Sequence, residues 1–321
     1  MRFVIRKLAQ LVVVLLLVTF LSFLMLELLP GDTATRLCAG AGTEECVAQK
    51  RAELHLDDAM PVRYARWLGN AVTGDLGSSA TNAQPVSEAL SERMPVTLEL
   101  LLYSQFIALL FAIPLGFLAA RRAGGVLDRT SSATLFMLLA IPNFVMAMVL
   151  IWIFPVTLKI GNASGYTTIN WTDPSTITAN FFSLLIPSIC LAVAEMAVYM
   201  RLLRTDLIAT LQEDYIAMAR AKGMPPRRVL LGHAFKPSTF SLVTVIGLNF
   251  GRLIGGTIII EVIFALNGLG GYTYAAIQKQ DYIAVQGAVL VIACFYVIIN
   301  FVIDLLYAAL DPRIRHARAL A

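Results

Sequence analysis

The chain contains little charge for its length. Only 14% of its 321 residues are Asp, Glu, Lys or Arg, and 58% are apolar, whereas a soluble domain carries about a quarter charged residues. So small a charged fraction cannot cover a water-exposed surface, which excludes a soluble globular protein and predicts an integral membrane protein. The net charge of +4 is spread between apolar runs and not gathered in one patch. We therefore expect contact with membrane lipid and no nucleic-acid partner.

Residues that carry catalysis or nucleotide binding are also scarce. The three histidines, His55, His233 and His316, lie in different regions of the sequence, and no cluster has the spacing of metal ligands or of a nucleophile with its base. The phosphate-binding pattern Gly-x-x-x-x-Gly-Lys-[Ser/Thr] does not occur. The sequence therefore predicts a chain that is not an enzyme and that holds no cofactor or metal of its own.

Six apolar runs are long enough to cross the membrane as helices, since about 30 Å of hydrocarbon requires roughly 20 residues. They cover residues 8–25, 100–120, 129–159, 182–203, 239–264 and 282–306. Pro142 interrupts the third run. A cleaved signal peptide is the alternative for the first run, but its apolar part exceeds the usual ~7–15 residues. The sequence thus predicts an all-α polytopic membrane protein with six transmembrane helices.

The basic residues predict the orientation of these spans. Lys and Arg gather near the N-terminus and in residues 121–129, 201–236 and 313–318, and cytoplasmic segments carry an excess of these residues. We therefore expect a multi-pass protein of the plasma (inner) membrane with both termini in the cytoplasm.

The same pattern divides the chain into three parts. Residues 1–29 form the N-terminal tail and first span, residues 30–95 an extracytoplasmic segment, and residues 96–321 a five-helix transmembrane core with a cytoplasmic loop at 205–238. Apolar residues at helical spacing within 44–56 and 61–68 predict a small helical cap in the extracytoplasmic segment.

The four cysteines fall into two pairs. Cys38 and Cys46 lie eight residues apart in the extracytoplasmic segment, a compartment that is oxidising in most bacteria, so we expect a disulfide; the alternative is two unpaired thiols in a loop. Cys190 and Cys294 lie within spans, where a buried thiol behaves as a small apolar group.

The loop at 205–238 carries the clearest local signals. Asp214 stands where a helix N-terminus favours negative charge, Lys222 lies in the last turn of the expected helix, and Gly223 occupies the position of a C′ glycine. Pro226 suits the first turn of a second helix. The residues predict a short helix, a sharp turn and another helix, although an ordinary basic loop between spans explains the composition equally well.

A resemblance separates these alternatives. The loop sequence DYIAMARAKGMPPRRVLLGHAFKP resembles the cytoplasmic EAA loop of ABC-importer permeases, in the variant found in dipeptide and oligopeptide permeases. Further stretches similar to the B-type permeases of that family occur in the family's order and cover nearly the whole chain: LLPGDTA, PVRYARWLGNAVTGDLGSS, VIGLNFGRLIGGTIIIEVIFALNGLGGYTYAAI and QDYIAVQGAVLVIACFYVIINFVIDLLYAALDPRIR.

The chain departs from the family pattern at a few positions. Ala217 and Met218 replace the usual Glu and Ala of the loop, whereas Ala219 and Gly223 match. Phe240-Ser241 stands where Leu-Pro is common, and Arg252 stands where a small residue is more usual, which bears on substrate preference.

The resemblance implies a type I ABC importer permease fold and ATP-driven import of di- or oligopeptides. In this family the loop helix docks on a separate ATPase subunit, which binds ATP and Mg. The implied partners are a second homologous permease subunit, one or two ABC ATPase subunits and an extracytoplasmic peptide-binding protein. The loop residues expected to couple to the ATPase are Asp214, Tyr215, Ala219, Ala221, Lys222, Gly223 and Arg227.

Other functions stay open at this point. Related permeases carry nickel or other small solutes, and this family likeness alone does not separate these from peptides. In a different class, a proton-coupled secondary transporter needs no ATPase, and a structural membrane anchor needs no path.

Two features of the spans carry further expectations. Ionisable side chains at membrane depth cost about 2.5–3.5 kcal/mol on insertion scales, so Glu195 and Arg252 are expected to line a translocation path or to form a structural ion pair. Gly247, Gly251 and Gly255 lie four residues apart in the fifth span. Such spacing lets helix backbones approach closely, either within this subunit or against the second permease.

Overall fold

The computed structural model describes residues 2–28, 34–35, 38, 43–53, 55–170 and 172–310, without the side chains of residues 2–4, 53 and 306–310. Within these ranges the regular structure is helical and contains no strand, as the apolar runs predict. The basic segment 313–318, used above for orientation, lies outside the described residues.

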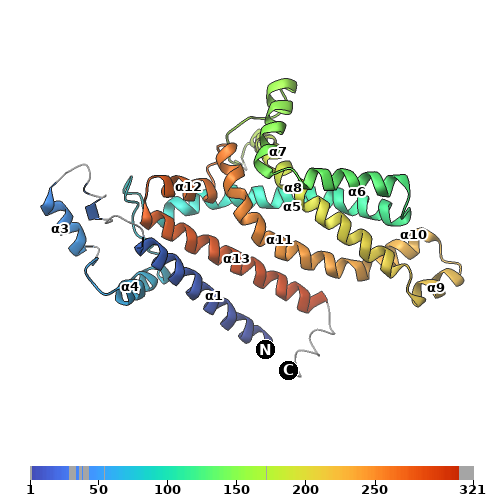
Figure 1. Ribbon diagram of the computed structural model, residues 1–321, viewed down its shortest axis with the longest axis horizontal. Helices are drawn as coiled ribbons and strands as arrows, with labels where there is room; N and C mark the ends of the chain where they lie inside the picture. Colours follow the sequence, from blue (N-terminus) through green and yellow to red (C-terminus); the bar gives the residue numbers. More distant parts are fainter. Residues whose placement is uncertain are drawn as a thin grey trace. The chain divides into compact units, whose positions relative to one another are not determined.

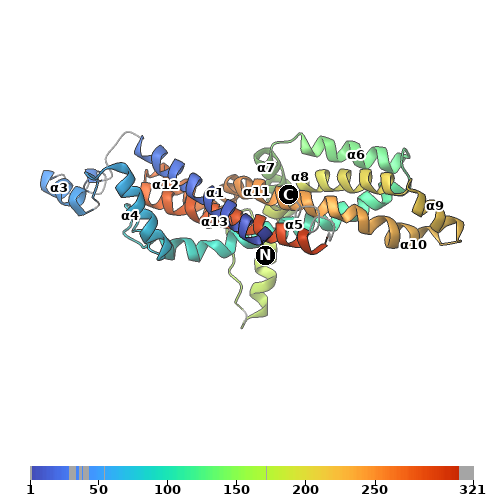
Figure 2. The same ribbon diagram turned by 90° about the horizontal axis from the view of Figure 1, so that it is seen from below.

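The helices are shown in Figures 1 and 2. They are α1 (Arg2–Glu27), α3 (Glu44–Glu53), α4 (Met60–Val72), α5 (Val86–Arg121), α6 (Val126–Leu139), α7 (Asn143–Ile151), η1 (Trp152–Leu158), α8 (Pro174–Thr210), α9 (Asp214–Ala221), α10 (Pro226–Arg228), η2 (Val229–Ala234), α11 (Phe235–Ile263), α12 (Leu269–Gln278) and α13 (Tyr282–Leu310), where η marks a π-helical segment.

Five helical stretches of the described residues are long and apolar enough to cross a membrane by themselves. They are Ile5–Glu27, Val86–Arg121, Pro174–Thr210, Pro226–Ile263 and Tyr282–Leu305.

A sixth span arises if α6 and the helix formed by α7 and η1 count as one broken span, since the two meet at a bend of 100°. The bend lies at Pro142, because proline lacks an amide hydrogen and disfavours helix at the residue before it. The third predicted run therefore is not one straight helix.

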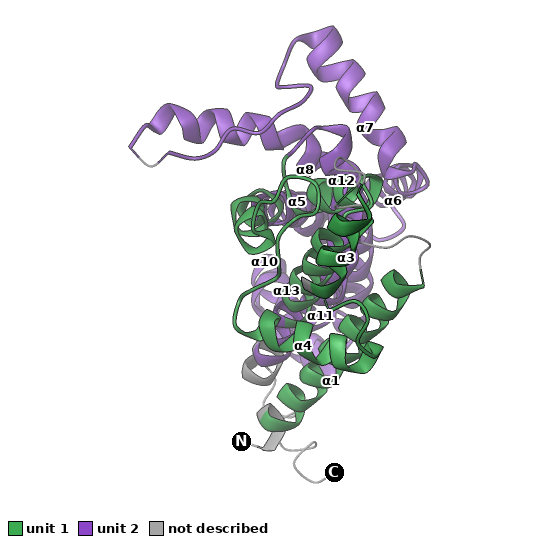
Figure 3. Cartoon of the chain, turned by 90° about the vertical axis from the view of Figure 1, so that its left-hand side faces the viewer, with its two compact units in different colours: residues 1–97, 267–297 green, residues 98–266, 298–321 purple. Residues whose placement is uncertain are grey.

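The chain forms two compact units, residues 1–97 with 267–297 and residues 98–266 with 298–321, which Figure 3 colours separately. The first unit therefore combines residues 1–97 with residues 267–297 from near the C-terminus. The division expected from the sequence did not join these two stretches. Helices α5 and α13 each begin in the first unit and end in the second.

In the first unit, α1 packs against α4 through aromatic and polar contacts. The Tyr64 hydroxyl lies 2.9 Å from Thr19 Oγ1, and Tyr64 also meets the edge of the Phe23 ring at a centroid distance of 5.6 Å. Arg63 Nη1 donates to Glu27 Oε1 at 2.6 Å. These contacts join two helices that are far apart in the sequence.

The two helices predicted for residues 44–56 and 61–68 are present as α3 and α4. Cys38 and Cys46 are joined by a disulfide, with their Cα atoms 5.9 Å apart, so residue 38 is tied to α3. The side of the membrane on which these helices lie stays a prediction.

In the second unit, α8 lies against α6, α7 and α11 (Figures 1 and 2). Its buried face carries small and large apolar residues in turn, which allows neighbouring helices to approach from several sides. Residues of α8 and α5 form a buried apolar cluster here, which includes Ala192, Tyr199 and Met200 of α8 and Ala108 and Ala112 of α5. At the end of α8, the chain continues directly into the loop that carries α9 and α10.

Candidate functional site

The loop between α8 and α11 adopts the predicted helix, turn and second helix. Helix α9 covers Asp214–Ala221 and is capped at its C-terminus by Lys222. Gly223 has φ +76°, and its amide donates to the Arg220 carbonyl at 2.9 Å. This left-handed glycine ends the helix as expected. Pro226 then occupies the first turn of α10.

The inner face of α9 is fixed to the subunit's own core. Ile216 is fully buried and Ala219 is 6% exposed, and both join the cluster formed with Leu203, Leu207 and Val229. The Ala219 side chain faces α8 and η2, and its expected contact with a partner stays a prediction. The small size of Ala219 lets α9 lie close to these two elements, which makes the loop a stiff extension of α8.

The outer face of α9 exposes large apolar side chains. Tyr215 is 44% exposed and Met218 is 57% exposed, and their spacing of three places them on one side of the helix. Asp214, Ala221 and Lys222 are exposed as well. Met218 entered the sequence analysis only as a departure from the family pattern. Its spacing from Tyr215 was the signal that it shares the exposed face.

A pocket of about 410 Å³ lies beside α9 and carries positive charge. Arg121 at the end of α5, Arg220 on α9 and Arg227 on α10 all contribute to its lining, and no acidic residue of the described ranges lines it. Arg227, predicted from the sequence, thus lies beside two arginines that the sequence analysis did not connect with it. The arrangement suits an acidic segment of a partner.

Within the spans, Glu195 forms the centre of a polar site. Arg252 Nη2 donates to Glu195 Oε1 at 2.9 Å, and Asn249 Nδ2 donates to Glu195 Oε2 at 2.5 Å. The Glu195 side chain is 2% exposed, whereas that of Arg252 is 62% exposed in the isolated chain. The structure thus brings the two predicted residues together as an ion pair between α8 and α11.

This polar site extends to residues that the sequence analysis missed. Tyr199, one turn after Glu195 on α8, donates its hydroxyl hydrogen to Gln105 Oε1 of α5 at 3.1 Å. The Gln105 side-chain nitrogen is buried and has no hydrogen-bond partner among the residues that the structure describes. Polar groups of three helices therefore meet inside the membrane-spanning part. A Tyr, an Asn and a Gln in apolar runs were the only signal in the sequence.

A second ion pair joins the start of α6 to the end of α8. Arg204 Nη2 donates to Asp128 Oδ2 at 2.7 Å, and the Gly124 amide donates to the same carboxylate at 2.8 Å. Asp128 is 4% exposed and Arg204 28%. The pair stabilises the segment of α8 that leads into the α9 loop. Because the two residues are 76 positions apart, no local pattern predicts their contact.

The glycines of α11 differ in their surroundings. A Cβ at Gly247 would lie 2.5 Å from Ile303 Cγ2 of α13, whereas a Cβ at Gly255 would meet no atom of the described part of the chain within 4 Å. Gly251, between them, is half-buried. Close helix packing thus occurs within the subunit at Gly247, and the Gly255 position is open in this chain.

Comparison with known families gives two matches that together cover most of the chain. Residues 112–316 match the family described as "Binding-protein-dependent transport system inner membrane component", and residues 1–101 match the description of its N-terminal part, "Binding-prot-dependent transport system membrane comp, N-term".

Relatives of similar length have related descriptions. The chain is 33% identical over 314 residues to a probable peptide ABC transporter permease protein of Sinorhizobium fredii, covering 98% of this chain and 99% of the relative. It is 35% identical to the oligopeptide transport system permease protein AppB of Bacillus subtilis, with 98% and 99% covered, and 32% identical to the dipeptide transport system permease protein DppB of Escherichia coli, with 99% and 100% covered.

Among solved structures, the fold is similar to that of an inward-facing MetNI methionine ABC transporter. The TM-score is 0.54 at 21% identity, with 70% of this chain and 96% of the other chain covered. At this identity the likeness concerns the fold alone. It agrees with the helical membrane architecture that the apolar runs predict.

Proposed function

The chain belongs to the family of binding-protein-dependent transport system inner-membrane components, and from this premise we propose that it is the permease subunit of an ATP-driven importer of di- or oligopeptides. Proteins of this family are multi-pass membrane subunits without catalytic activity. The observation that carries the coupling role is the α9 helix, seated on its own core by Ile216 and exposing Tyr215 and Met218. The peptide substrate rests on the names of its full-length relatives.

The proposed coupling is mechanical. The outer face of α9 docks on a separate ATPase subunit, which holds ATP and Mg, and the buried inner face passes movement to α8 because the helices are closely packed. Arg121, Arg220 and Arg227 receive acidic side chains of that ATPase. In this arrangement the loop and both termini lie in the cytoplasm.

The contact is tested by measuring how tightly the ATPase subunit binds the permease in membranes. Met218→Ser removes an exposed apolar side chain from the outer face and is expected to weaken ATPase binding about tenfold, a loss of roughly 1.4 kcal/mol, typical of a well-packed apolar contact. Gln212→Ala, exposed just before α9, is the matched control and leaves binding unchanged. Equal binding of both variants and the unaltered protein would remove α9 from the interface.

The proposed translocation path contains Arg252, held by Glu195. Because Glu195 Oε1 accepts from Arg252 Nη2 and a guanidinium carries about five N–H donors, the exposed Arg252 retains donors for passing solute. Arg252→Ala is expected to lower uptake while assembly is retained. Glu195→Gln, which keeps the shape of the side chain, separates loss of charge from loss of packing. Normal uptake by both variants leaves the ion pair with a structural role alone.

The other functions are separated by two measurements on the membrane-extracted protein with the subunits that co-purify. An importer subunit is expected to co-purify with an ATPase, and the rate of ATP hydrolysis is expected to rise when binding protein and peptide are added. A proton-coupled secondary transporter co-purifies with no ATPase and shows no such stimulation. Competition of uptake by nickel but not by a set of di- to pentapeptides would favour the metal permease instead.

A further inference from the structure

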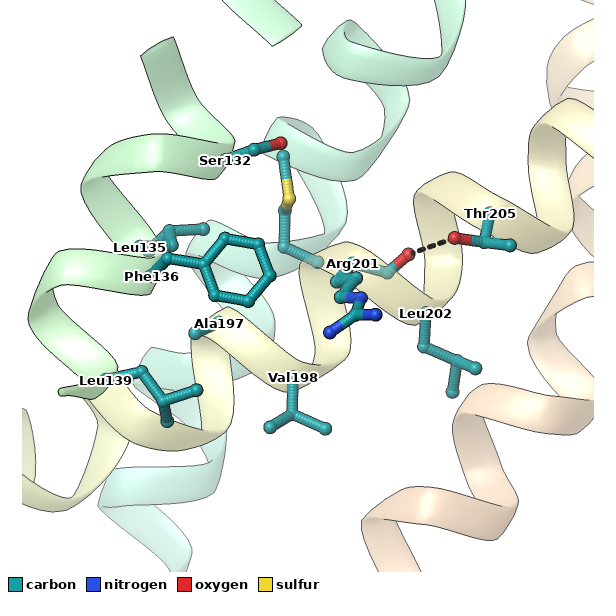
Figure 4. A pocket seen from close by; sticks show the side chains of 10 residues that line it. Ser132, Leu135, Phe136, Leu139, Ala197, Val198, Arg201, Leu202 and Thr205 are labelled. Carbon is teal, nitrogen blue, oxygen red and sulfur yellow. Dashed lines mark hydrogen bonds between the residues drawn. The ribbon is translucent and has the colours of Figure 1, made fainter. Parts of the chain in front are cut away.

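A groove of about 380 Å³ lies between α6 and α8, away from the Glu195 site and from the α9 face. Figure 4 shows the Arg201 guanidinium of α8 beside the Phe136 ring of α6, at 5.3 Å from the ring centroid. The groove is open at its side, since Phe136 is 49% exposed and Leu139 40% exposed. Its volume is in the range of about 300–1,000 Å³ that is typical of ligand sites.

The groove has a polar end and an apolar end. The Asp128–Arg204 pair brings the start of α6 to the end of α8, so the two helices run in opposite directions along the groove. Ser132 and Thr205 therefore lie toward the polar end, and Leu139 toward the apolar end with Ala197 and Val198 (Figure 4). The groove is amphipathic along its length.

Arg201 lies at the depth where this polarity changes. It is two residues from the end of the predicted span 182–203, which places it at the level of lipid headgroups. Among the described residues it forms no ion pair, and the nearby Asp128 is already occupied by Arg204 and the Gly124 amide. Its guanidinium instead lies over the Phe136 ring as a cation–π contact. Arg201 is itself exposed, so its guanidinium is open to an anion from outside the chain at the headgroup level.

We propose that this groove binds one anionic phospholipid, with the phosphate on Arg201 and an acyl chain along Phe136 and Leu139. The Ser132 and Thr205 hydroxyls lie at the headgroup end and the aliphatic side chains at the chain end, which matches the order of polarity in a phospholipid. The occupant is a lipid and not an aqueous anion, because most of the lining is apolar. Basic residues at the membrane surface favour anionic lipids by about fivefold for each charge.

The test uses the membrane-extracted protein with its co-purifying subunits, stripped of lipid by detergent and titrated with dioleoyl-phosphatidylglycerol or dioleoyl-phosphatidylcholine. Bound lipid is counted by native mass spectrometry. The unaltered complex is expected to retain one phosphatidylglycerol about fivefold more tightly than phosphatidylcholine. Arg201→Ala is expected to abolish this preference, and Arg201→Lys to keep most of it. Soluble glycerol phosphate at the same concentration does not compete, since it lacks the acyl chain.

Two further variants separate the site from general effects. Arg122→Ala removes an exposed arginine that does not line the groove and is expected to leave the preference unchanged. Val198→Trp fills the apolar end and is expected to reduce binding of both lipids. The proposal is overturned if Arg201→Ala binds phosphatidylglycerol like the unaltered protein. It is also overturned if Arg201→Ala releases the second permease subunit while lipid binding is unchanged, since the groove is then a subunit interface.

Discussion

Replacing Gly223 by valine adds a β-branched side chain at a residue whose φ is +76°. L residues in the left-handed region cost roughly 1–2 kcal/mol, and β-branched residues are especially unfavourable there. A Cβ at Gly223 would meet no atom of the described residues within 4 Å, so these residues add no further steric cost. The strain therefore falls on the turn that holds α9, and the membrane spans stay folded.

The strain converts into a loss of partner binding. If the ATPase binds only the native turn, 1–2 kcal/mol corresponds to an affinity that is about 5–30-fold lower. The measurement is the affinity of the ATPase subunit for the permease in nanodiscs, together with peptide uptake. Gly223→Asn separates strain from bulk, because asparagine tolerates the left-handed region: it retains affinity if the turn alone matters and loses it if the partner fills this space.

A matched control is Gly74→Val. Gly74 has φ +90°, and a Cβ there would also meet no described atom within 4 Å, but it lies in the segment predicted to be extracytoplasmic. This variant carries the same backbone strain and is expected to keep full ATPase affinity. Normal affinity and uptake in Gly223→Val, or an equal loss in Gly74→Val, would refute the assignment of this turn to coupling.

Three further results are expected. Arg204→Met leaves the buried Asp128 carboxylate without its partner and should lower the free energy of unfolding by about 3–5 kcal/mol, measured by thermal unfolding of the solubilised protein; the double variant with Asp128→Leu recovers most of the loss, and no recovery contradicts the pairing. Gly255→Ala should stabilise α11 by up to about 1 kcal/mol. Gly247→Ala should destabilise the protein by about 1–3 kcal/mol, because its Cβ has no room beside Ile303. Equal melting temperatures of the two variants argue against close packing at Gly247. A membrane-impermeant maleimide should label Cys38 in intact cells only after reduction. Labelling without reductant contradicts the disulfide, and no labelling even after reduction contradicts its exposure on the outer side.

The α9 loop was predictable because its signals are local. The acidic first turn, the C′ glycine and the following prolines all lie within a short stretch, and each acts on the backbone of its own neighbours. The direction in which Ala219 points was not predictable from the same stretch. It depends on Leu203 and Leu207 of α8 and on Val229, which form the surface on which α9 rests.

The polar site was predictable only in part. Glu195 and Arg252 are conspicuous because charges are rare in apolar runs, but Asn249 and Gln105 are ordinary polar residues until α5, α8 and α11 are brought together. Asp128 was overlooked for the same reason, as its partner belongs to another helix.

Apolar run length, charge distribution and motif order determined by themselves that this is a helical, multi-pass membrane protein and a member of a transport family. The helical, multi-pass character follows from the transfer of each residue into hydrocarbon and from backbone hydrogen bonding within each helix, which depend on the segment alone. The family was indicated by the resemblance of its motifs and not by these physical terms. The break at Pro142 was visible in the sequence, although its angle of 100° was not. Tertiary structure alone decided the Glu195–Arg252 and Asp128–Arg204 pairs and the groove beside Arg201. Each depends on how far a helix is rotated about its axis and which helix it meets, and packing between distant parts of the chain sets both.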